Sequence, residues 1–425
     1  MNPIKRSISQ HSADLLPGYK QTEVGVIPEE WNAVPMEAIT THIGDGLHGT
    51  PIYASNGDFF FLNGNNLQEG KIVVTSETRS VNHSEFTKYQ KPLSHRSILM
   101  SINGTIGNIG LFNGERVVLS KSAAYINVKP DVSRQFIYHF LQTEIVRQQF
   151  LDGLTGSTIG NLGLATIRRT QIALPPTVVE QRAIAKALSD MDALLEGLDQ
   201  LIAKKRDIKQ ATMQQLLTGK MRLPGFHDAW IILTAGEIGK FHGGFGFPIQ
   251  WQGKHNGTYP FFKVSDMNND GNEDYMTAAN NYISESVQRR LGANIFPQGS
   301  IVLAKVGAAI FLERKKILGQ PSCIDNNMTA YVMDTQRVDV RFIHALLLLT
   351  RLGDLVSTTA LPSINGNQLS GISISLPSLH EQKAIVAILS EMDTELAVLE
   401  HRRDKTTLLK QAMMQELLTG RIRLV

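Results

Sequence analysis

The residues that could build a catalytic centre are few and poorly spaced. Asp58 with Glu69-Gly70-Lys71 resembles the acidic pair and lysine of a metal-dependent nuclease, but such triplets arise by chance and Glu69 falls in a predicted turn. Phe241 to Gly246 is glycine-rich, yet no strand-then-helix pattern surrounds it. Gly219-Lys220 lacks the preceding glycine and the following Ser or Thr of a phosphate-binding loop. The chain is therefore predicted to be non-catalytic.

The cysteine count excludes an internal disulfide, and the spacing of the histidines does not fit a zinc site. Cys323 is the only cysteine, so no internal disulfide can form, and this fits a reducing cytoplasm. The 12 histidines are scattered and show no zinc-ligand spacing. Cys323 is predicted to be a small buried hydrophobe. No cofactor or metal is expected in this chain.

Polar side chains that could bind a ligand gather in two glycine-rich stretches, Gly44–Asn66 and Gly243–Asn272. Amide, hydroxyl and basic side chains supply the directed donors and acceptors that base edges and phosphates require. The alternative is that these stretches are ordinary solvated turns. The candidate contact residues are His48, Thr50, Tyr53, Asn63, Asn65, Asn66 and Lys121 in the first half, and Gln250, Gln252, Lys254, Lys263, Ser265, Asp266, Asn268 and Lys305 in the second.

Net charge does not by itself predict nucleic-acid binding. The chain of 425 residues carries a formal charge of only +3, spread nearly evenly along its length. Nucleic-acid-binding domains usually show a strongly basic face. A DNA-binding surface would therefore have to come from local arrangement, with basic help from a partner.

The polar stretches belong to a scaffold that occurs twice. Short β-type runs, among them Phe59–Leu62 and residues 72–75, 98–102, 117–119 and 124–128, alternate with glycine and asparagine turns. Residues 97–104 are echoed by 300–307 at an offset of 203, and a helix is expected near residues 133–150 and again near 340–356. Trp31 and Trp230 stand at equivalent entrances and are predicted core anchors. The polar loops have diverged while the scaffold has been kept.

A long helix follows each copy of the scaffold. Residues 180–223 and 381–424 align at a constant offset of 201 with 22 identities in 44 positions, including the closing Leu-Leu-Thr-Gly. Prolines precede each stretch, glycines follow it, and apolar residues from Ile184 to Ile202 recur at heptad spacing. About 40 residues at about 1.5 Å each would form a rod of roughly 60 Å. Periodicity alone is equally typical of a structural hairpin or a dimerisation helix.

Two basic clusters lie where the heptad pattern weakens, at Lys204-Lys205-Arg206 and at Arg402-Arg403. They fit a solvated helix face, or a contact with a partner or with the DNA backbone.

The duplicated motifs resemble the specificity subunit of type I restriction–modification systems. The resemblance is carried by ALPPTVVEQRAIA (residues 173–185) with SLPSLHEQKAIV (375–386), and by QQLLTGKMRLPGF (214–226) with QELLTGRIRLV (415–425). It covers essentially the whole chain. In that family, two long conserved helices packed antiparallel each follow a target-recognition domain, and they also dock the modification subunits.

The resemblance implies a DNA-recognition subunit without catalysis of its own. Its partners would be double-stranded DNA, two adenine-N6 methyltransferase subunits that bind S-adenosylmethionine, and ATP-dependent, Mg-using restriction subunits. Two recognition units on a rigid spacer would read two half-sites about a helical turn apart. A non-catalytic, two-headed protein-binding adaptor remains the alternative.

We therefore predict an internally duplicated, pseudo-twofold chain of mixed α/β domains separated by antiparallel coiled-coil helices. The predicted segments are a loosely ordered N-terminal tail (1–16), target-recognition domains (17–175 and 224–375) and spacer segments (176–223 and 376–425), with the helices themselves at 177–219 and 378–420. No run of 18 apolar residues is present, and the N-terminus lacks the apolar region of a signal peptide.

Overall fold

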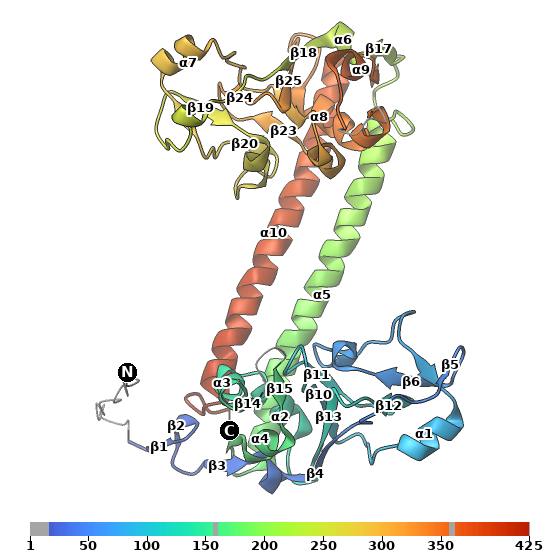
Figure 1. The fold of residues 1–425 in the computed structure, drawn as a ribbon, viewed down its shortest axis with the longest axis vertical. Helices are drawn as coiled ribbons and strands as arrows, with labels where there is room; N and C mark the ends of the chain where they lie inside the picture. Colours follow the sequence, from blue (N-terminus) through green and yellow to red (C-terminus); the bar gives the residue numbers. More distant parts are fainter. Residues whose placement is uncertain (1–16, 156–159, 357–361, 425) are drawn as a thin grey trace. The chain divides into compact units, whose positions relative to one another are not determined.

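The computed structural model describes residues 17–155, 160–356 and 362–424. The chain divides into two compact units: unit 1 runs to Asp199 and resumes at His401, and unit 2 is Gln200–Glu400. Each unit contains one globular domain and half of each long helix (Figure 1). The domain limits given above stay predictions, because this division assigns each helix to both units. The predicted tail, residues 1–16, lies outside the described residues.

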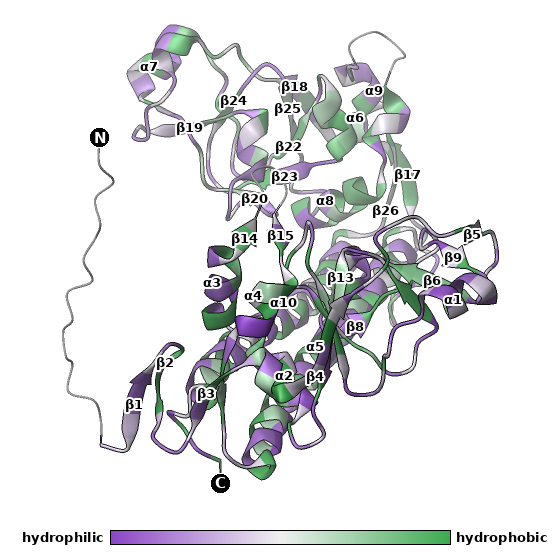
Figure 2. Ribbon diagram, turned by 60° about the horizontal axis from the view of Figure 1, so that its bottom comes forward, coloured by the Kyte–Doolittle hydropathy of each residue, from purple (hydrophilic) through white to green (hydrophobic). Residues whose placement is uncertain are grey.

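The domain of unit 1 is built on two four-stranded sheets. One is antiparallel with strand order β11-β10-β13-β4, and the other has order β12-β6-β9-β5 with β12 parallel to β6. Their bounds are β4 (Thr40–Asp45), β5 (Tyr53–Ala54), β6 (Phe59–Leu62), β9 (Ser80–Val81), β10 (Ser97–Ser101), β11 (Ile109–Leu111), β12 (Val117–Leu119) and β13 (Ala123–Val128). Figure 2 shows how the hydrophobic strand β6 contrasts with the hydrophilic strand β1 of the first hairpin.

Short elements complete this domain. They are β1 (Tyr19–Thr22), β2 (Gly25–Pro28), β3 (Asn32–Pro35), η1 (Met36–Ile39), η2 (Gly64–Asn66), β7 (Leu67–Gln68), β8 (Lys71–Ile72), α1 (His83–Tyr89), α2 (Arg134–Phe140), α3 (Glu144–Asp152), β14 (Leu154–Thr155), β15 (Asn161–Leu162), α4 (Leu164–Arg169) and β16 (Gln171–Leu174). The single helix predicted near 133–150 was wrong. Thr143 starts a new helix by accepting a hydrogen bond from the Val146 amide, so the segment forms α2 and α3.

The domain of unit 2 repeats this plan with a five-stranded sheet, order β18-β25-β22-β23-β20, and a three-stranded sheet, order β21-β19-β24. The bounds are β17 (Ile231–Thr234), α6 (Ala235–Ile238), β18 (Gly239–Gly243), η3 (Ile249–Trp251), β19 (Tyr259–Phe262), η4 (Val264–Asn268), β20 (Tyr275–Met276), β21 (Tyr282–Ile283), α7 (Glu285–Leu291), β22 (Ile301–Ala304), η5 (Ala308–Leu312), β23 (Lys315–Leu318), β24 (Cys323–Ile324), β25 (Met328–Met333), α8 (Val340–Leu349), η6 (Leu352–Leu355), α9 (Gly366–Ser370) and β26 (Ser373–Leu376).

Several local predictions can be checked against these bounds. The strands predicted at 59–62 and 117–119 are confirmed, whereas the run at 72–75 pairs only over Lys71–Ile72. The helix predicted to reach residue 356 ends at Leu349, since Lys315 Nζ donates to the Thr350 carbonyl and a 3₁₀ turn follows. Cys323 is fully buried, as predicted.

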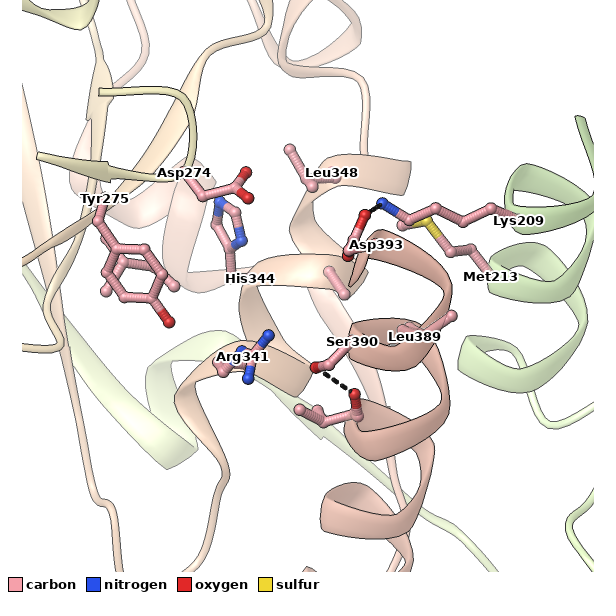
Figure 3. A pocket seen from close by; sticks show the side chains of 13 residues that line it. Lys209, Met213, Asp274, Tyr275, Arg341, His344, Leu348, Leu389, Ser390 and Asp393 are labelled. Carbon is pink, nitrogen blue, oxygen red and sulfur yellow. Dashed lines mark hydrogen bonds and ion pairs between the residues drawn. The ribbon is translucent and has the colours of Figure 1, made fainter. Parts of the chain in front are cut away.

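The two long helices, α5 (Val178–Leu217) and α10 (Leu379–Leu417), lie within three residues of their predicted limits at each end. In unit 1 the first half of α5 packs on the second half of α10, and Asp192 pairs there with Lys410. In unit 2 the equivalent residues, Asp393 and Lys209, form the same ion pair (Figure 3). Of the predicted heptad residues, Ile184, Leu188, Leu198 and Ile202 are buried.

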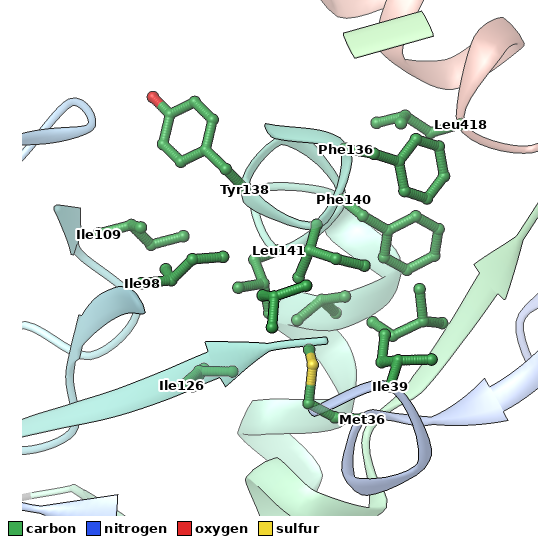
Figure 4. Close-up of a cluster of buried hydrophobic side chains, with 14 of the residues drawn as sticks. Met36, Ile39, Ile98, Ile109, Ile126, Phe136, Tyr138, Phe140, Leu141 and Leu418 are labelled. Carbon is green, nitrogen blue, oxygen red and sulfur yellow. The ribbon is translucent and has the colours of Figure 1, made fainter. Parts of the chain in front are cut away.

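The Leu-Leu-Thr-Gly repeat inserts the end of each helix into a domain core. Leu417 and Leu418 join the core of unit 1, next to Phe136 and Phe140 of α2 (Figure 4). Gly420 adopts a left-handed φ of 72°, and a Cβ there would lie 2.6 Å from Pro28. A residue without a side chain is therefore needed at this helix end. Leu216 and Leu217 enter the core of unit 2 in the same way, and Gly219 has a φ of 69°.

The repeated Glu-Gln pair anchors the start of each long helix. In unit 2, Glu381 is buried and accepts hydrogen bonds from Arg222 at 2.6 and 2.8 Å and from Trp230 Nε1 at 3.2 Å. In unit 1, Glu180 pairs with Arg423 in the same way.

The neighbouring glutamines and the two tryptophans complete these anchors. Gln181 Oε1 accepts from the Ser133 amide, and Gln382 Oε1 accepts from the Asp339 amide, so each glutamine holds the N-cap residue of a domain helix, α2 in unit 1 and α8 in unit 2. Trp31 is fully buried as predicted, whereas Trp230 is only partly buried; it packs against the core of unit 2, and its indole Nε1 donates to Glu381.

Candidate nucleic-acid interface

In unit 1, loops that leave four strands, β4, β6, β10 and β12, at their carboxyl ends meet in one cluster. The loop after β6 is held by a capping box between Asn63 and Asn66, and the Gly64 amide donates to Ser122 Oγ at 3.0 Å. A Cβ on Gly64 would lie 2.1 Å from Ser101 Oγ at the end of β10, so the chain passes too close for a side chain. The first recognition cluster is defined as residues 46–48, 63–66, 103–105 and 120–122.

Cross-links between loops tie this cluster together. Asn103 Nδ2 donates to the Lys121 carbonyl at 3.3 Å, and Thr105 Oγ1 donates to Asn65 Oδ1 at 3.3 Å. The Leu47 amide donates to the Leu119 carbonyl at 2.8 Å. The ends of β4, β6, β10 and β12 therefore position the loops, together with the Asn63–Asn66 capping box.

Four predicted contact residues of unit 1 sit exposed on this cluster: His48, Asn63, Asn65 and Lys121. His48 Nε2 lies 2.6 Å from Asp45 Oδ2, which orients its ring. Directed donors and acceptors thus point outward from a rigid base. These are the groups that can contact base edges and phosphates in a groove.

The other three predicted residues of unit 1 have different roles or places. Asn66 is used inside the loop, because its side chain caps Asn63 and donates to the Val73 carbonyl at 2.8 Å. Tyr53 lies on β5 at the edge of the second sheet, 5.8 Å from Phe61 between ring centroids. Thr50 is exposed beyond the end of β4.

Unit 2 forms an equivalent cluster from the same strand ends. The Lys305 amide donates to the Asn327 carbonyl at 2.9 Å, and the Asp325 amide donates to the Phe262 carbonyl at 2.9 Å. The Gly244 amide donates to the Met328 carbonyl, and the Phe245 amide to the Ile324 carbonyl. The second recognition cluster is defined as residues 243–247, 263–268, 305–307 and 325–327.

Lys263, Ser265, Asn268 and Lys305 contribute to this second cluster. Lys263 Nζ donates to Gln252 Oε1 at 3.1 Å, and a Cβ on Gly243 would lie 2.8 Å from Lys305 Nζ. Both ammonium groups therefore lie over the loops. Gln250 and Lys254 are exposed on the neighbouring loop, where Lys254 Nζ lies 5.1 Å from the Trp251 ring centroid.

Two buried carboxylates lie beneath these lysines. Asp266 is fully buried and accepts from the Lys263 amide at 2.7 Å and from Asn280 Nδ2 at 2.6 Å, so its oxygens are used within the loop. Burial raises the pKa of Asp266 and of Asp325, and Lys263 opposes both shifts. The predicted contact residue Asp266 is thus placed to shape the loop.

Sequence reasoning missed four residues that the structure brings into the clusters: Asn103, Thr105, Asp325 and Asn327. The available signal was the glycine- and asparagine-rich turn at 103–108 and the Asp-Asn-Asn turn at 325–327, each of which lies between β-type runs.

The catalytic alternatives gain no support. Lys71 pairs with Glu196 of α5 at 2.5 Å, and the glycine-rich Phe241–Gly246 segment lies largely on strand β18 and leads to no helix beyond a 3₁₀ turn. Within residues 17–155, 160–356 and 362–424, no group of three or more His, Cys, Asp or Glu side chains is arranged to hold a metal ion.

The mid-helix basic clusters are largely used by ion pairs between the helices. Lys205 pairs with Glu395 at 2.6 Å and Arg206 pairs with Glu400, both in unit 2. In unit 1, Arg403 lies 3.8 Å from Asp199. Lys204 and Arg402 are exposed.

Taken together, the fold defines a protein with two related α/β domains, each carrying a polar loop cluster, and two long packed helices. Residues 51–204 and 228–407 match the model of the type I restriction modification DNA specificity domain family. Because these two regions make up most of the chain, the chain belongs to that family. It is a DNA specificity subunit of a type I restriction–modification system, and such subunits are non-catalytic.

Similar proteins match this chain along nearly its whole length. The MjaVIII specificity subunit of Methanocaldococcus jannaschii is 23% identical over 417 residues, covering 93% of this chain and 94% of that protein. The S subunit structure from M. genitalium superposes with a TM-score of 0.53 at 16% identity, covering 91% of this chain and 96% of that one.

A chain from a structure that addresses complex assembly and conformational transition of the type I R-M system gives a TM-score of 0.59 at 17% identity. It covers 93% of this chain and 99% of that chain. At these identities, the structural similarities establish the shared fold. Among the described residues, none of the helices contains a hydrophobic segment that could span a bilayer.

Proposed function

We propose that this chain reads an asymmetric, split DNA target, one half with each recognition cluster. The observation that carries the proposal is that the same strand ends build both clusters, yet the side chains differ. Asn63, Asn65 and Lys121 in unit 1 occupy places taken by Lys263, Ser265 and Asn326 in unit 2. Different donor and acceptor sets at equivalent places would select different bases.

The long helices would set the gap between the two half-sites and dock two methyltransferase subunits. Each unit exposes an apolar patch on its helices at equivalent positions: Ile208 is 42% exposed in unit 2, and Leu409 is 54% exposed in unit 1. Leu201, seven residues before Ile208 in unit 2, and Leu408, next to Leu409 in unit 1, are also exposed, at positions that are not equivalent. Two equivalent patches support two copies of one partner.

The chemistry would then belong to the partners. S-adenosylmethionine would bind the methyltransferase subunits, and ATP with Mg would bind the restriction subunits. This chain would supply the DNA sequence specificity. It would work in a reducing cytoplasm, which suits its single free thiol.

Methylation mapping tests the proposal. The chain is expressed with its neighbouring methyltransferase subunit in a methylation-free host, and the genome is sequenced for N6-methyladenine. We expect one motif in two unequal halves with a fixed gap. A stable complex without any methylation would contradict DNA reading and favour a protein-binding adaptor.

Two variants sharpen that test. Exchanging residues 17–175 for those of a relative should change one half-site only, and a change in both would refute independent domains. Inserting one heptad into both long helices should change the gap and preserve the half-sites. An unchanged gap would mean that the helices do not set the spacing.

A further inference from the structure

Unit 1 holds a basic pocket that none of the roles above uses. It has a volume of about 340 Å³ and lies between the segment before β10, the start of α2 and the first turns of α5. Its lining contains no Asp or Glu and includes Arg96, Arg134, Arg182 and Lys186. Positive charge therefore dominates the lining.

Three guanidinium groups in this pocket have no carboxylate partner among the described residues. Arg96 donates only to backbone carbonyls, including that of Val128 at 2.8 Å from its Nε. Arg134 donates to the Phe112 carbonyl at 2.8 Å and to Asn113 Oδ1 at 3.2 Å. Arg182 is exposed on α5. Neutral acceptors hold the first two in place without removing their charge.

Electrostatics within the pocket is repulsive. Burial, followed by repulsion from Arg96, lowers the pKa of Arg134, and only Glu115 opposes this. Lys186 is neutralised by Asp190 at 2.7 Å, so the excess positive charge comes from the arginines. An oxyanion with two negative charges would relieve this repulsion, and guanidinium groups bind such anions through paired hydrogen bonds.

Unit 2 lacks two of the three pocket guanidinium groups at the equivalent positions and has a lysine, Lys383, in place of Arg182. Ser133 and Asp339 correspond because Gln181 and Gln382 cap them identically, so Val340 stands where Arg134 does. At the offset of 203 that relates Ser97 to Ser300, Gly299 replaces Arg96. Asp339 also brings a carboxylate to this place. A function shared by both units would have kept the arginines twice, so this one belongs to unit 1 alone.

The pocket is separate from the first recognition cluster. Arg96 directly precedes β10, whereas Asn103 follows it, so five strand residues lie between them, a length of about 16 Å. A ligand here would not compete for the loops of the recognition cluster.

We propose that this pocket binds the phosphate group of a phosphate-bearing ligand, one per chain. The ligand is either a free phosphate monoester or the backbone of a nucleic acid. Three guanidinium groups provide the donors, and the volume leaves room for more than a bare phosphate ion. Binding to a free monoester would not depend on the proposed reading of DNA.

The test uses the purified full chain and the pair Arg182→Gln and Lys383→Gln, which occupy the same position in the two long helices. Arg182 is exposed and forms no hydrogen bond or ion pair with the described residues, so its loss should leave the fold intact. Binding of AMP and inorganic phosphate is measured by calorimetry, and binding of a duplex of arbitrary sequence is measured against salt concentration. Arg134→Gln, checked for folding by thermal unfolding, serves as a second variant.

We expect one of two supporting results. AMP binds one to one and weakens about tenfold in Arg182→Gln but not in Lys383→Gln, which identifies a free phosphate ligand. Alternatively, AMP fails to bind, while the slope of log K against log salt for the duplex falls by about 0.9 in Arg182→Gln only, which identifies a backbone contact.

Two results would overturn the proposal. One is equal behaviour of Arg182→Gln and Lys383→Gln in every titration. The other is a defect of Arg182→Gln confined to binding of the methyltransferase subunit, which would assign the pocket to an acidic protein surface. Methylation mapping of Arg182→Gln separates this failure from that of the proposed function, because the split motif should persist.

Discussion

Unit 1 and unit 2 carry the same residue types where a domain helix meets the long helices, yet they pack them differently. In unit 1, His139 of α2 is fully buried, with Nε2 3.0 Å from Ser189 Oγ and Nδ1 3.9 Å from the Asp192 carboxylate. In unit 2, His344 instead lies 2.7 Å from the Lys315 carbonyl oxygen. Ser390 donates to the Val386 carbonyl, and a cavity of about 80 Å³ remains (Figure 3).

A shift of one residue explains the difference. His139 is the sixth residue after its N-cap Ser133, whereas His344 is the fifth after Asp339. One residue turns a helix by about 100°, so the two imidazoles leave their helices in different directions. The Lys–Asp pair between the long helices is the same in both units. Duplication has therefore preserved the contact between helices and let each domain repack against it.

The largest effect should come from the leucines that insert each helix end into a core. Leu418→Ala in unit 1 and Leu217→Ala in unit 2 remove equivalent side chains that are each 1% exposed. Each should lower the free energy of unfolding by about 2–5 kcal/mol. Urea denaturation of the two variants provides the check, and a loss in only one would show that the helix ends are not equivalent.

Acid should destabilise the chain through its buried histidines. Burial lowers the pKa of His139 to about 4 and also lowers that of His344. The unfolded chain binds protons near pH 6.5, so this stability is complete above that pH and is lost as pH falls toward 4. For His139 the loss is on the order of 3 kcal/mol. Unfolding measured between pH 7 and 4 should show a shallower slope in His139→Gln, and an unchanged slope would contradict a neutral buried imidazole.

The buried glutamates should differ between the units. Glu381→Gln removes the carboxylate that pairs with Arg222 and weakens the hydrogen bond from Trp230. It should therefore lower the free energy of unfolding by about 2 kcal/mol. Glu180→Gln should cost less, because Arg423 also pairs with Glu30 at 2.6 Å. Thermal unfolding of both variants compares them directly. Equal losses of stability would mean that Glu30 does not replace Glu180 as the partner of Arg423.

The smallest effect on stability, and one confined to a single recognition cluster, should follow from Gly64→Ala. The new Cβ would meet Ser101 Oγ and displace the Asn63–Asn66 loop. The equivalent residue in unit 2 is Val264, so Val264→Ala is the matched control. We expect Gly64→Ala to lower the free energy of unfolding by about 1 kcal/mol. We also expect it to relax the base specificity in one half of the methylated motif. A motif unchanged in both halves would place base contacts away from this loop.

Part of the candidate site was predictable, and part was not. Asn63, Asn65, Lys263 and Lys305 were proposed because glycine turns beside β-type runs mark exposed loops, where amide and basic side chains can contact bases and phosphates. Asp266 looked the same in sequence, yet it is buried, since a 3₁₀ turn uses its carboxylate as a cap. The arginines of the basic pocket escaped notice because Arg96, Arg134 and Arg182 come from three separate elements.

The duplication, the limits of both long helices and the lack of catalytic motif spacing could be predicted from the sequence, because they depend on local propensity and on internal repetition. Which distant residues meet depends on the three-dimensional packing of the chain. Glu180 finds Arg423 across 243 positions, and the loops after β6, β10 and β12 converge only because their strands share two sheets. This packing also determines that His139 is closed in and His344 borders a cavity. Such pairings follow from packing in three dimensions, where a rotation of one residue along a helix changes every neighbour of a side chain.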